Sequence, residues 1–174
     1  MQRHQLEHII RAASGITGAS TFVIIGSQAL LGQFPQAPDE LLVSIEADLF
    51  SQRDPADSDL IDGSIGEGSP FHQTFGYYAH GVGAETAVLP AGWQERLVPV
   101  RNENNGGGTG LCLEVHDLAV SKLVAGREKD LTFITGLLRH GLADGRTVRK
   151  RLADTGLAPE RLALCEARLK RIAP

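Results

Sequence analysis

The stretch TFVIIGSQALLG, residues 21–32, decides the fold of this chain. Thr21–Ile25 is short, apolar and rich in β-branched residues, which is typical of a buried strand. Gly26 and Ser27 then break the pattern, and QALLG has the spacing of a short helix. The stretch therefore predicts a strand, a tight turn and a helix, and the backbone N–H groups of such a turn can bind a phosphate.

A second predicted strand, residues 41–50, carries two carboxylates at alternate positions. Glu46 and Asp48 lie two residues apart, and the side chains of a strand alternate between its faces. Both carboxylates are therefore expected on one side of the sheet, where they could hold one or two Mg²⁺ ions, or Mn²⁺ in their place. A phosphate-binding turn followed by a metal-binding strand indicates phosphoryl transfer.

The remaining pattern predicts an α+β fold. Leu6, Ile9, Ile10 and Ala13 recur at helical spacing near the start of the chain. Further strands are expected at 84–89, 95–101 and 111–115, and helices at 70–78, 117–126 (with Asp117 as N-cap), 128–141, 144–156 and 158–173. We expect a mixed β-sheet of four to five strands, an N-terminal helix and a C-terminal helical group. The core is predicted over residues 1–115 and the helical part over residues 116–174, as one domain or two closely packed halves.

The composition excludes several protein classes. The chain has 174 residues, 22% of them charged, with 20 Gly and 2 Cys. This balance does not fit collagen, a coiled coil or a disulfide scaffold. No apolar stretch approaches the ~20 residues that span a bilayer, and the start lacks an apolar leader, so a cytoplasmic location is expected. Cys112 and Cys165 are expected to be buried or half-buried thiols without a chemical role.

Charge is distributed unevenly along the chain. Residues 1–138 hold 8 of the 17 basic and 17 of the 21 acidic residues, whereas residues 139–174 hold the other 9 and 4. An acidic body is therefore followed by a basic tail. The tail suggests either a segment that binds a polyanion or, more plainly, helix faces exposed to solvent.

Three segments together resemble a known superfamily. VIIGSQALLG (23–32), SIEADLF (44–50) and HDLAVSKLVAGREKDLTFITGLL (116–138) are similar to the nucleotidyltransferase superfamily, whose fold is shared with DNA polymerase β. Among its members they resemble bacterial nucleotidyltransferase-like proteins related to the toxins of abortive-infection toxin–antitoxin pairs. The resemblance implies an enzyme that uses Mg²⁺ to move a nucleoside monophosphate from an NTP to an acceptor such as RNA.

The resemblance also implies site residues. Gly26 and Ser27 would bind the triphosphate, and Glu46 and Asp48 would bind metal and act in catalysis. Lys122, as a catalytic and nucleotide-binding residue, and Asp130 would face the nucleotide. If one helix continued through Gly126, these two residues would share a helical face.

The sequence departs from the pattern of the superfamily in three ways. The 18 residues between Ser27 and Glu46 are more than is usual, the first acid of the pair is Glu, and a third carboxylate is not evident. Glu85, on the strand expected at 84–89, is the first choice for that third metal ligand, and Glu114 is the reserve.

Other interpretations stay open. One is a degenerate nucleotidyltransferase fold that acts as a non-enzymatic partner in a toxin–antitoxin pair, with an antitoxin or other protein bound to it. A second is a nucleic-acid-binding module that uses only the tail. The rings at 71–78 could stack a base or pack a helix. His4 and His8 lack a third ligand nearby, so a zinc site is rejected.

Overall fold

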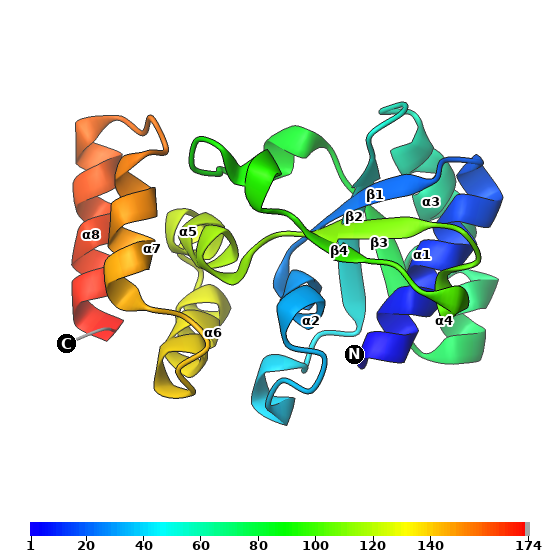
Figure 1. The fold of residues 1–174 in the computed structure, drawn as a ribbon, viewed down its shortest axis with the longest axis horizontal. Coiled ribbons are helices and arrows are strands. Elements are labelled where there is room, and N and C mark those ends of the chain that lie inside the picture. Colours follow the sequence, from blue (N-terminus) through cyan, green and yellow to red (C-terminus); the bar gives the residue numbers. More distant parts are fainter. Residues whose placement is uncertain (173–174) are drawn as a thin grey trace. The chain divides into compact units, whose positions relative to one another are not determined.

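The computed structural model describes residues 1–172 (Figure 1). Contacts divide the chain into two compact units. The first unit comprises Met1–Thr86 and Leu97–Leu113, and the second comprises Ala87–Arg96 and the residues from Glu114 onward. The first unit is thus discontinuous in sequence. The predicted division of the chain into domains at residue 115 stays a prediction.

A five-stranded mixed sheet forms the centre of the first unit. Its strands are β1 (Thr21–Ile25), β2 (Glu46–Ser51), β3 (Tyr78–Gly81), β4 (Val98–Val100) and β5 (Thr109–Cys112), in the order β3-β2-β1-β5-β4. β1 runs antiparallel to β2 and parallel to β5, β2 runs parallel to β3, and β4 runs antiparallel to β5. The expected α+β fold with a mixed sheet is confirmed.

Helices cover one face of this sheet. The helices of the first unit are α1 (Arg3–Thr17), α2 (Leu30–Gln33), α3 (Asp57–Ile65) and α4 (Pro70–Phe75), with 3₁₀ turns η1 (Ser27–Ala29), η2 (Asp39–Leu41), η3 (Ala84–Thr86) and η5 (Glu103–Asn105). A Cβ added at Gly110 of β5 would lie 2.6 Å from Ile10 Cδ1 of α1. One added at Gly81 of β3 would lie 2.2 Å from the Ser58 carbonyl of α3. Both glycines therefore permit close packing of a helix on the same face of the sheet (Figure 1).

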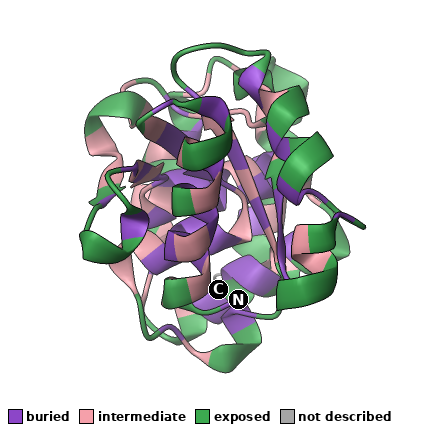
Figure 2. Cartoon of the chain, turned by 90° about the vertical axis from the view of Figure 1, so that its right-hand side faces the viewer, coloured by how far each residue is buried: buried purple, intermediate pink, exposed green. Residues whose placement is uncertain are grey.

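The core of the first unit follows the predicted helical period. Leu6, Ile9, Ile10 and Ala13 of α1 are fully buried, as are Phe22, Val23 and Ile24 of β1. Figure 2 shows buried residues along the strands and exposed ones on the outer sides of the helices. Burial of these apolar side chains contributes about 1.5–3 kcal/mol each before the entropy cost of folding is subtracted.

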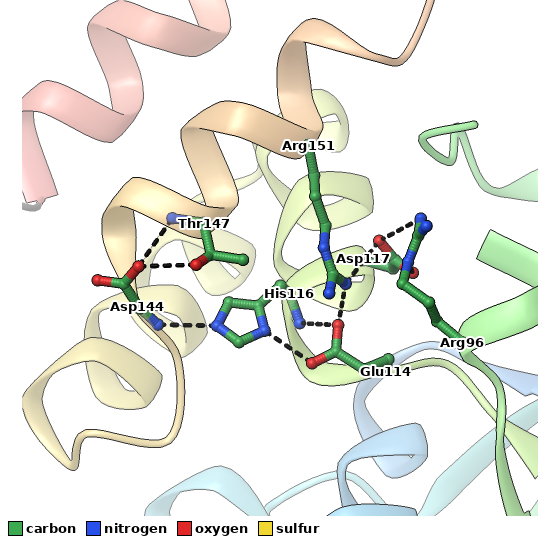
Figure 3. Close-up of polar contacts among 7 residues, drawn as sticks. All are labelled: Arg96, Glu114, His116, Asp117, Asp144, Thr147 and Arg151. Atoms are coloured by element: carbon green, nitrogen blue, oxygen red, sulfur yellow. Dashed lines mark hydrogen bonds and ion pairs between the residues drawn. The ribbon is translucent and has the colours of Figure 1, made fainter. Parts of the chain in front are cut away.

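The second unit consists of helices joined by a polar network. They are α5 (Val115–Ala125), α6 (Glu128–Arg139), α7 (Gly145–Ala153) and α8 (Pro159–Ile172), preceded by the 3₁₀ turn η4 (Trp93–Arg96). Asp117 has no exposed surface and accepts hydrogen bonds from Arg96 Nε at 2.8 Å and Arg151 Nη1 at 2.9 Å (Figure 3). The expected N-cap role of Asp117 is wrong, because Glu114 holds that position and accepts from the N–H of His116.

The middle of the chain differs from the sequence-based prediction. The strand expected at 84–89 is absent, since residues 84–86 form η3. The helix expected at 70–78 ends at Phe75, where Gly76 takes a left-handed conformation, and β3 begins at Tyr78. The other differences are these: α3 was not expected, β2 starts at 46 rather than 41, β4 covers 98–100 of the expected 95–101, and β5 covers 109–112 rather than 111–115.

Two further expectations concern burial and hydropathy. Cys112 and Cys165 are free, buried thiols, as expected. Over residues 1–172, no helix combines the length and the apolar character needed to cross a bilayer.

Candidate active site

Four polar side chains project from two neighbouring strands on the face opposite α1 and α3. β2 and β3 are parallel, and their register pairs Glu46 with Tyr78 and Asp48 with His80. The alternate residues Ala47, Leu49 and Ala79 are fully buried on the other face. Strand alternation therefore places Glu46 and Asp48 on one face, as the sequence predicts, together with two side chains from β3.

These side chains lie within contact distance of one another. His80 Nδ1 lies 3.1 Å from Asp48 Oδ1 and 3.6 Å from Glu46 Oε1. The Tyr78 hydroxyl donates a hydrogen bond of 2.9 Å to the other oxygen of Glu46, Oε2. One ligand atom from each of Glu46, Asp48 and His80 falls within 4.8 Å of the other two. The three side chains thus form a compact set of potential metal ligands.

Burial of the carboxylates and their closeness to each other together determine the electrostatics of this cluster. Burial, reinforced by the hydrogen bond and charge of Glu46, raises the pKa of Asp48 to about 6 although His80 opposes the shift. Burial and Glu46 likewise raise the pKa of Tyr78 to about 12. Burial lowers the pKa of His80, but the hydrogen bond and charge of Asp48, with the charges of Asp62 and Glu46, outweigh it and raise that pKa. A bound cation would relieve this repulsion between carboxylates.

Gly26 lies directly against this cluster. It follows Ile25, the register partner of Asp48 on the antiparallel strand β1. Its backbone has φ +67° and ψ −172°, and a Cβ built there would lie 2.0 Å from Asp48 Oδ2. Any side chain at residue 26 would therefore occupy the space beside the carboxylate. The Gly26–Ser27 turn and the acidic pair, which the sequence predicts to be neighbours, are neighbours in the structure.

The long connection between Ser27 and Glu46 is folded back toward this turn. It contains η1, α2 and η2. Gln28, which is fully buried, donates a hydrogen bond of 3.0 Å from Nε2 to the carbonyl of Ser44. This hydrogen bond ties the end of the connection, just before β2, to its beginning, just after Gly26. The long connection is thus compatible with Glu46 and Asp48 lying beside Gly26.

Neither expected third carboxylate belongs to the cluster. Glu85 lies on the exposed turn η3 rather than on a strand. Glu114 caps α5 in the second unit, where it contacts His116 and Arg151 (Figure 3). In the part of the chain that the structure describes, the three-residue ligand set is Glu46, Asp48 and His80. The sequence does not indicate His80 as a ligand, because its pattern favours a helix up to Tyr78, whereas β3 begins at that residue.

Lys122 and Asp130 lie in the second unit, where they contact each other. Lys122 Nζ is 3.1 Å from Asp130 Oδ1 and 4.6 Å from the centre of the Phe133 ring. Arg127 Nε also donates to Asp130, at 2.6 Å. Burial alone would raise the pKa of Asp130, but the hydrogen bonds and charges of Arg127 and Lys122 have the larger effect and lower the pKa below its usual value.

Lys122 and Asp130 were expected to share one helical face if a single helix continued through Gly126. The structure has no such continuous helix at this position. α5 ends at Ala125, and Gly126 has φ +66°. Lys122 is only 8% exposed and Asp130 is fully buried. Their proximity thus comes from the packing of α5 with α6, and their expected role at a nucleotide stays a prediction.

The aromatic segment packs against α1. His8 Nδ1 lies 2.8 Å from the Tyr77 hydroxyl, and the His8 ring contacts Phe71 and Phe75. An open hollow of about 520 Å³ is lined by His4, His8, Arg11, Phe75, Tyr77 and Asn104. Ring packing is therefore observed, and stacking on a base stays untested. The His8 ring packs against these aromatic rings, and the rejection of a zinc site at His4 and His8 stays a prediction.

Comparison with known proteins supplies an independent observation. No curated protein and no solved structure matches the chain. A family model described as a nucleotidyltransferase of unknown function (DUF6036) matches residues 4–159. This match covers most of the chain, including the strands, the turn at Gly26 and the ligand cluster. The chain therefore belongs to this family of nucleotidyltransferases.

Proposed function

We propose that this protein transfers a nucleoside monophosphate from an NTP to an acceptor, with Mg²⁺ or Mn²⁺ as cofactor. The observation that carries the proposal is the convergence of Glu46 and Asp48 beside Gly26 in a chain of this family. The donor set fits a divalent cation, because two carboxylates lie on one face with an imidazole between them. A cofactor of this kind accords with the family.

The chain's own residues would perform three tasks. Glu46 and Asp48 would hold the cation, Gly26 would let the polyphosphate approach the sheet closely, and the Ser27 backbone would contact it. Lys122 and Asp130 are proposed from the resemblance to face the nucleotide. When bound, a divalent cation supplies charge neutralisation and Lewis-acid polarisation at the phosphates. In the transfer, an acceptor hydroxyl would lose its proton to solvent and its oxygen would bond to the α-phosphorus. The bond from the α-phosphorus to the bridging oxygen would break, and pyrophosphate would leave.

RNA is the proposed acceptor, contacted through the basic helices α7 and α8. Arg146, Arg149 and Lys150 of α7 are exposed, and such side chains can neutralise phosphates. Arg151, in contrast, is engaged with Glu114 and Asp117. The cellular role that we propose, from the resemblance alone, is that of a toxin in a cytoplasmic toxin–antitoxin pair, with an antitoxin as partner protein.

A second candidate is a degenerate fold that binds a partner protein without catalysis. It is favoured by one observation, the presence of His80 where a neighbouring strand would otherwise supply a carboxylate. The two candidates differ in whether the protein binds a divalent cation and NTP.

Incubation with labelled NTPs, a divalent cation and total RNA tests the proposal. We expect label to appear in RNA with the wild type and not with Asp48→Asn, which keeps the size of the side chain but removes its charge. Asp59→Asn, at an exposed position of α3, is the matched control and should retain transfer. Absence of cation and NTP binding would contradict the proposed function and favour the degenerate fold. Binding of cation and NTP without transfer of label to RNA would count against RNA as the acceptor.

A further inference from the structure

We infer that His80 is the third metal ligand and that it makes the site select a first-row transition cation, represented by Mn²⁺, over Mg²⁺. This inference rests on the proposed function, since it concerns the same site. It differs from the expectation for three carboxylates, which would favour Mg²⁺.

The geometry of the apposed strands places His80 in a ligand position. Parallel pairing fixes His80 opposite Asp48, so its direction is set by the sheet rather than by a loop. Nδ1 faces Oδ1 of Asp48 at 3.1 Å and Oε1 of Glu46 at 3.6 Å. Neighbouring ligands about 2.1 Å from one cation are separated by ~3 Å when they subtend a right angle. The two separations from Nδ1 are close to that size, and one ligand atom from each of the three residues lies within 4.8 Å of the other two. Side-chain movements would bring the set to coordination distances.

The second oxygen of Glu46 is already engaged. The Tyr78 hydroxyl donates to Oε2 at 2.9 Å, and the Tyr78 ring lies 4.7 Å from the ring of His72 on α4. His72 is in turn held by a hydrogen bond from the N–H of Gly68 to its Nδ1. Tyr78 is thus a positioning residue that turns Oε1 of Glu46 toward His80 and Asp48.

The chemistry of the ligands then decides which cation is favoured. Mg²⁺ binds carboxylate oxygens and water and keeps an octahedral shell of oxygen ligands. Imidazole suits Zn, Cu, Fe and Ni ions, and affinity in the first-row series is lowest for Mn²⁺, so Mn²⁺ is the member of the series that gains least from a nitrogen ligand. Mn²⁺ also accepts hard phosphate oxygens, which transfer from an NTP requires. One nitrogen between two carboxylates therefore tilts selection away from Mg²⁺.

The site is also accessible to a cation. The side chain of His80 is 51% exposed and those of Glu46 and Asp48 are 38% and 24% exposed. The ligand atoms are held by two strands, yet solvent reaches them without opening the sheet.

Direct measurement of cation binding, without nucleotide, tests this inference. Calorimetric titration with Mn²⁺ and with Mg²⁺ should give a lower dissociation constant for Mn²⁺ than for Mg²⁺. His80→Ala should weaken Mn²⁺ binding by about tenfold or more, since loss of even an outer partner of a metal ligand typically costs ~10–100-fold in affinity, and should leave Mg²⁺ binding nearly unchanged. His80→Asp should strengthen Mg²⁺ binding and reduce the preference. His4→Ala, at an exposed histidine of α1, is the matched control.

Spectroscopy separates a direct ligand from an indirect effect. Pulsed electron paramagnetic resonance of bound Mn²⁺ should show coupling to an imidazole nitrogen in the wild type and in His4→Ala, and none in His80→Ala. An unchanged Mn²⁺/Mg²⁺ ratio in His80→Ala, or no nitrogen coupling in the wild type, would overturn the inference. Selective Mn²⁺ binding without transfer to RNA would instead leave the inference standing and count against the proposed activity.

Discussion

The Nδ1 atom of His80 lies 3.1 Å from Oδ1 of Asp48, across two parallel strands that are joined in sequence through α3 and α4. Two of the four polar side chains of the candidate site, Tyr78 and His80, therefore come from β3, which is separated in sequence from β2 by two helices. The contact also means that the site depends on the register between β2 and β3. A slip of one residue would turn His80 to the opposite face.

Replacing Gly26 by alanine should damage both stability and cation binding. A Cβ would meet Asp48 Oδ2 at 2.0 Å, and the backbone has φ +67° and ψ −172°, which side chains rarely adopt. We expect a loss of about 1–3 kcal/mol in the free energy of unfolding and weaker Mn²⁺ binding by calorimetry. Gly15→Ala is the control. It lies in α1 with nothing within 4 Å of the added Cβ, so it should stabilise by ~0.5–1 kcal/mol. Equal stability of the two variants would contradict this account of Gly26.

Acid should weaken the second unit through Glu114. Burial alone would raise the pKa of this carboxyl, but the hydrogen bond and charge of His116 and the charge of Arg151 lower it from 4.5 to about 2. Because the folded-state pKa lies below the unfolded one, the stabilisation is present above pH ~4.5 and is lost as the pH falls toward 2.

Glu114→Gln should therefore be less stable than the wild type at pH 7, and the difference should shrink between pH ~4.5 and 2. Urea unfolding at a series of pH values measures it. Glu166→Gln, at an exposed position of α8, should follow the wild type. A difference that is constant with pH would show that packing, not charge, is responsible.

Lys122→Met should destabilise the second unit. The substitution removes the ion pair of Lys122 with the buried carboxylate of Asp130 and leaves the ion pair of Asp130 with Arg127. The cost should be below the ~3–5 kcal/mol typical for a buried pair that loses its only counter-charge. Lys129→Met, at an exposed position of α6, should cost little by thermal unfolding. The NTP-induced rise in melting temperature, measured relative to each variant's own baseline, tests whether Lys122 also contacts nucleotide.

Charge reversal on α7 should weaken RNA binding. Arg146, Arg149 and Lys150 are exposed, so changing all three to Glu should leave folding nearly intact. Each lost phosphate contact should reduce the steepness of the plot of log K for RNA binding against log salt concentration by about 0.7 to 0.9. Filter binding at several salt concentrations measures this, with Arg101→Glu as a control in the first unit. Arg151→Glu should instead lower the melting temperature, because it breaks the contacts with Glu114 and Asp117. Equal RNA affinity of triple variant and wild type would remove RNA as the proposed acceptor.

Elements with strong local signals were predictable from sequence. β1 was expected at its observed bounds, and the apolar period near the start of the chain predicted α1. After residue 115, helical patterns that end at glycines or at the terminus predicted the four C-terminal helices. These elements depend on burial patterns within a few residues. Capping was less predictable, because Asp117 satisfies the usual N-cap preference yet forms a buried contact with two arginines instead.

Elements defined by distant partners were not predictable. β3 has four residues, one of them Gly, and becomes a strand because it pairs with β2. α3 contains Gly63 and several acidic residues, so its helical pattern is weak. In the candidate site, Glu46, Asp48 and Gly26 could be identified from a local motif. Identifying His80 requires the register between β2 and β3, which pairs it with Asp48, 32 residues earlier in the sequence.

The order of the strands has a consequence for synthesis on the ribosome. β2 and β3, which carry Glu46, Asp48 and His80, emerge together with β1 by residue 81. β5, which pairs with the second edge of β1, lies later, at 109–112. Until β5 is made, the nascent chain exposes an apolar strand edge, the kind of surface that recruits chaperones or other strands. A fragment that ends at Thr86 would thus carry the whole ligand set on an incomplete sheet, and aggregation rather than loss of ligands would limit its use.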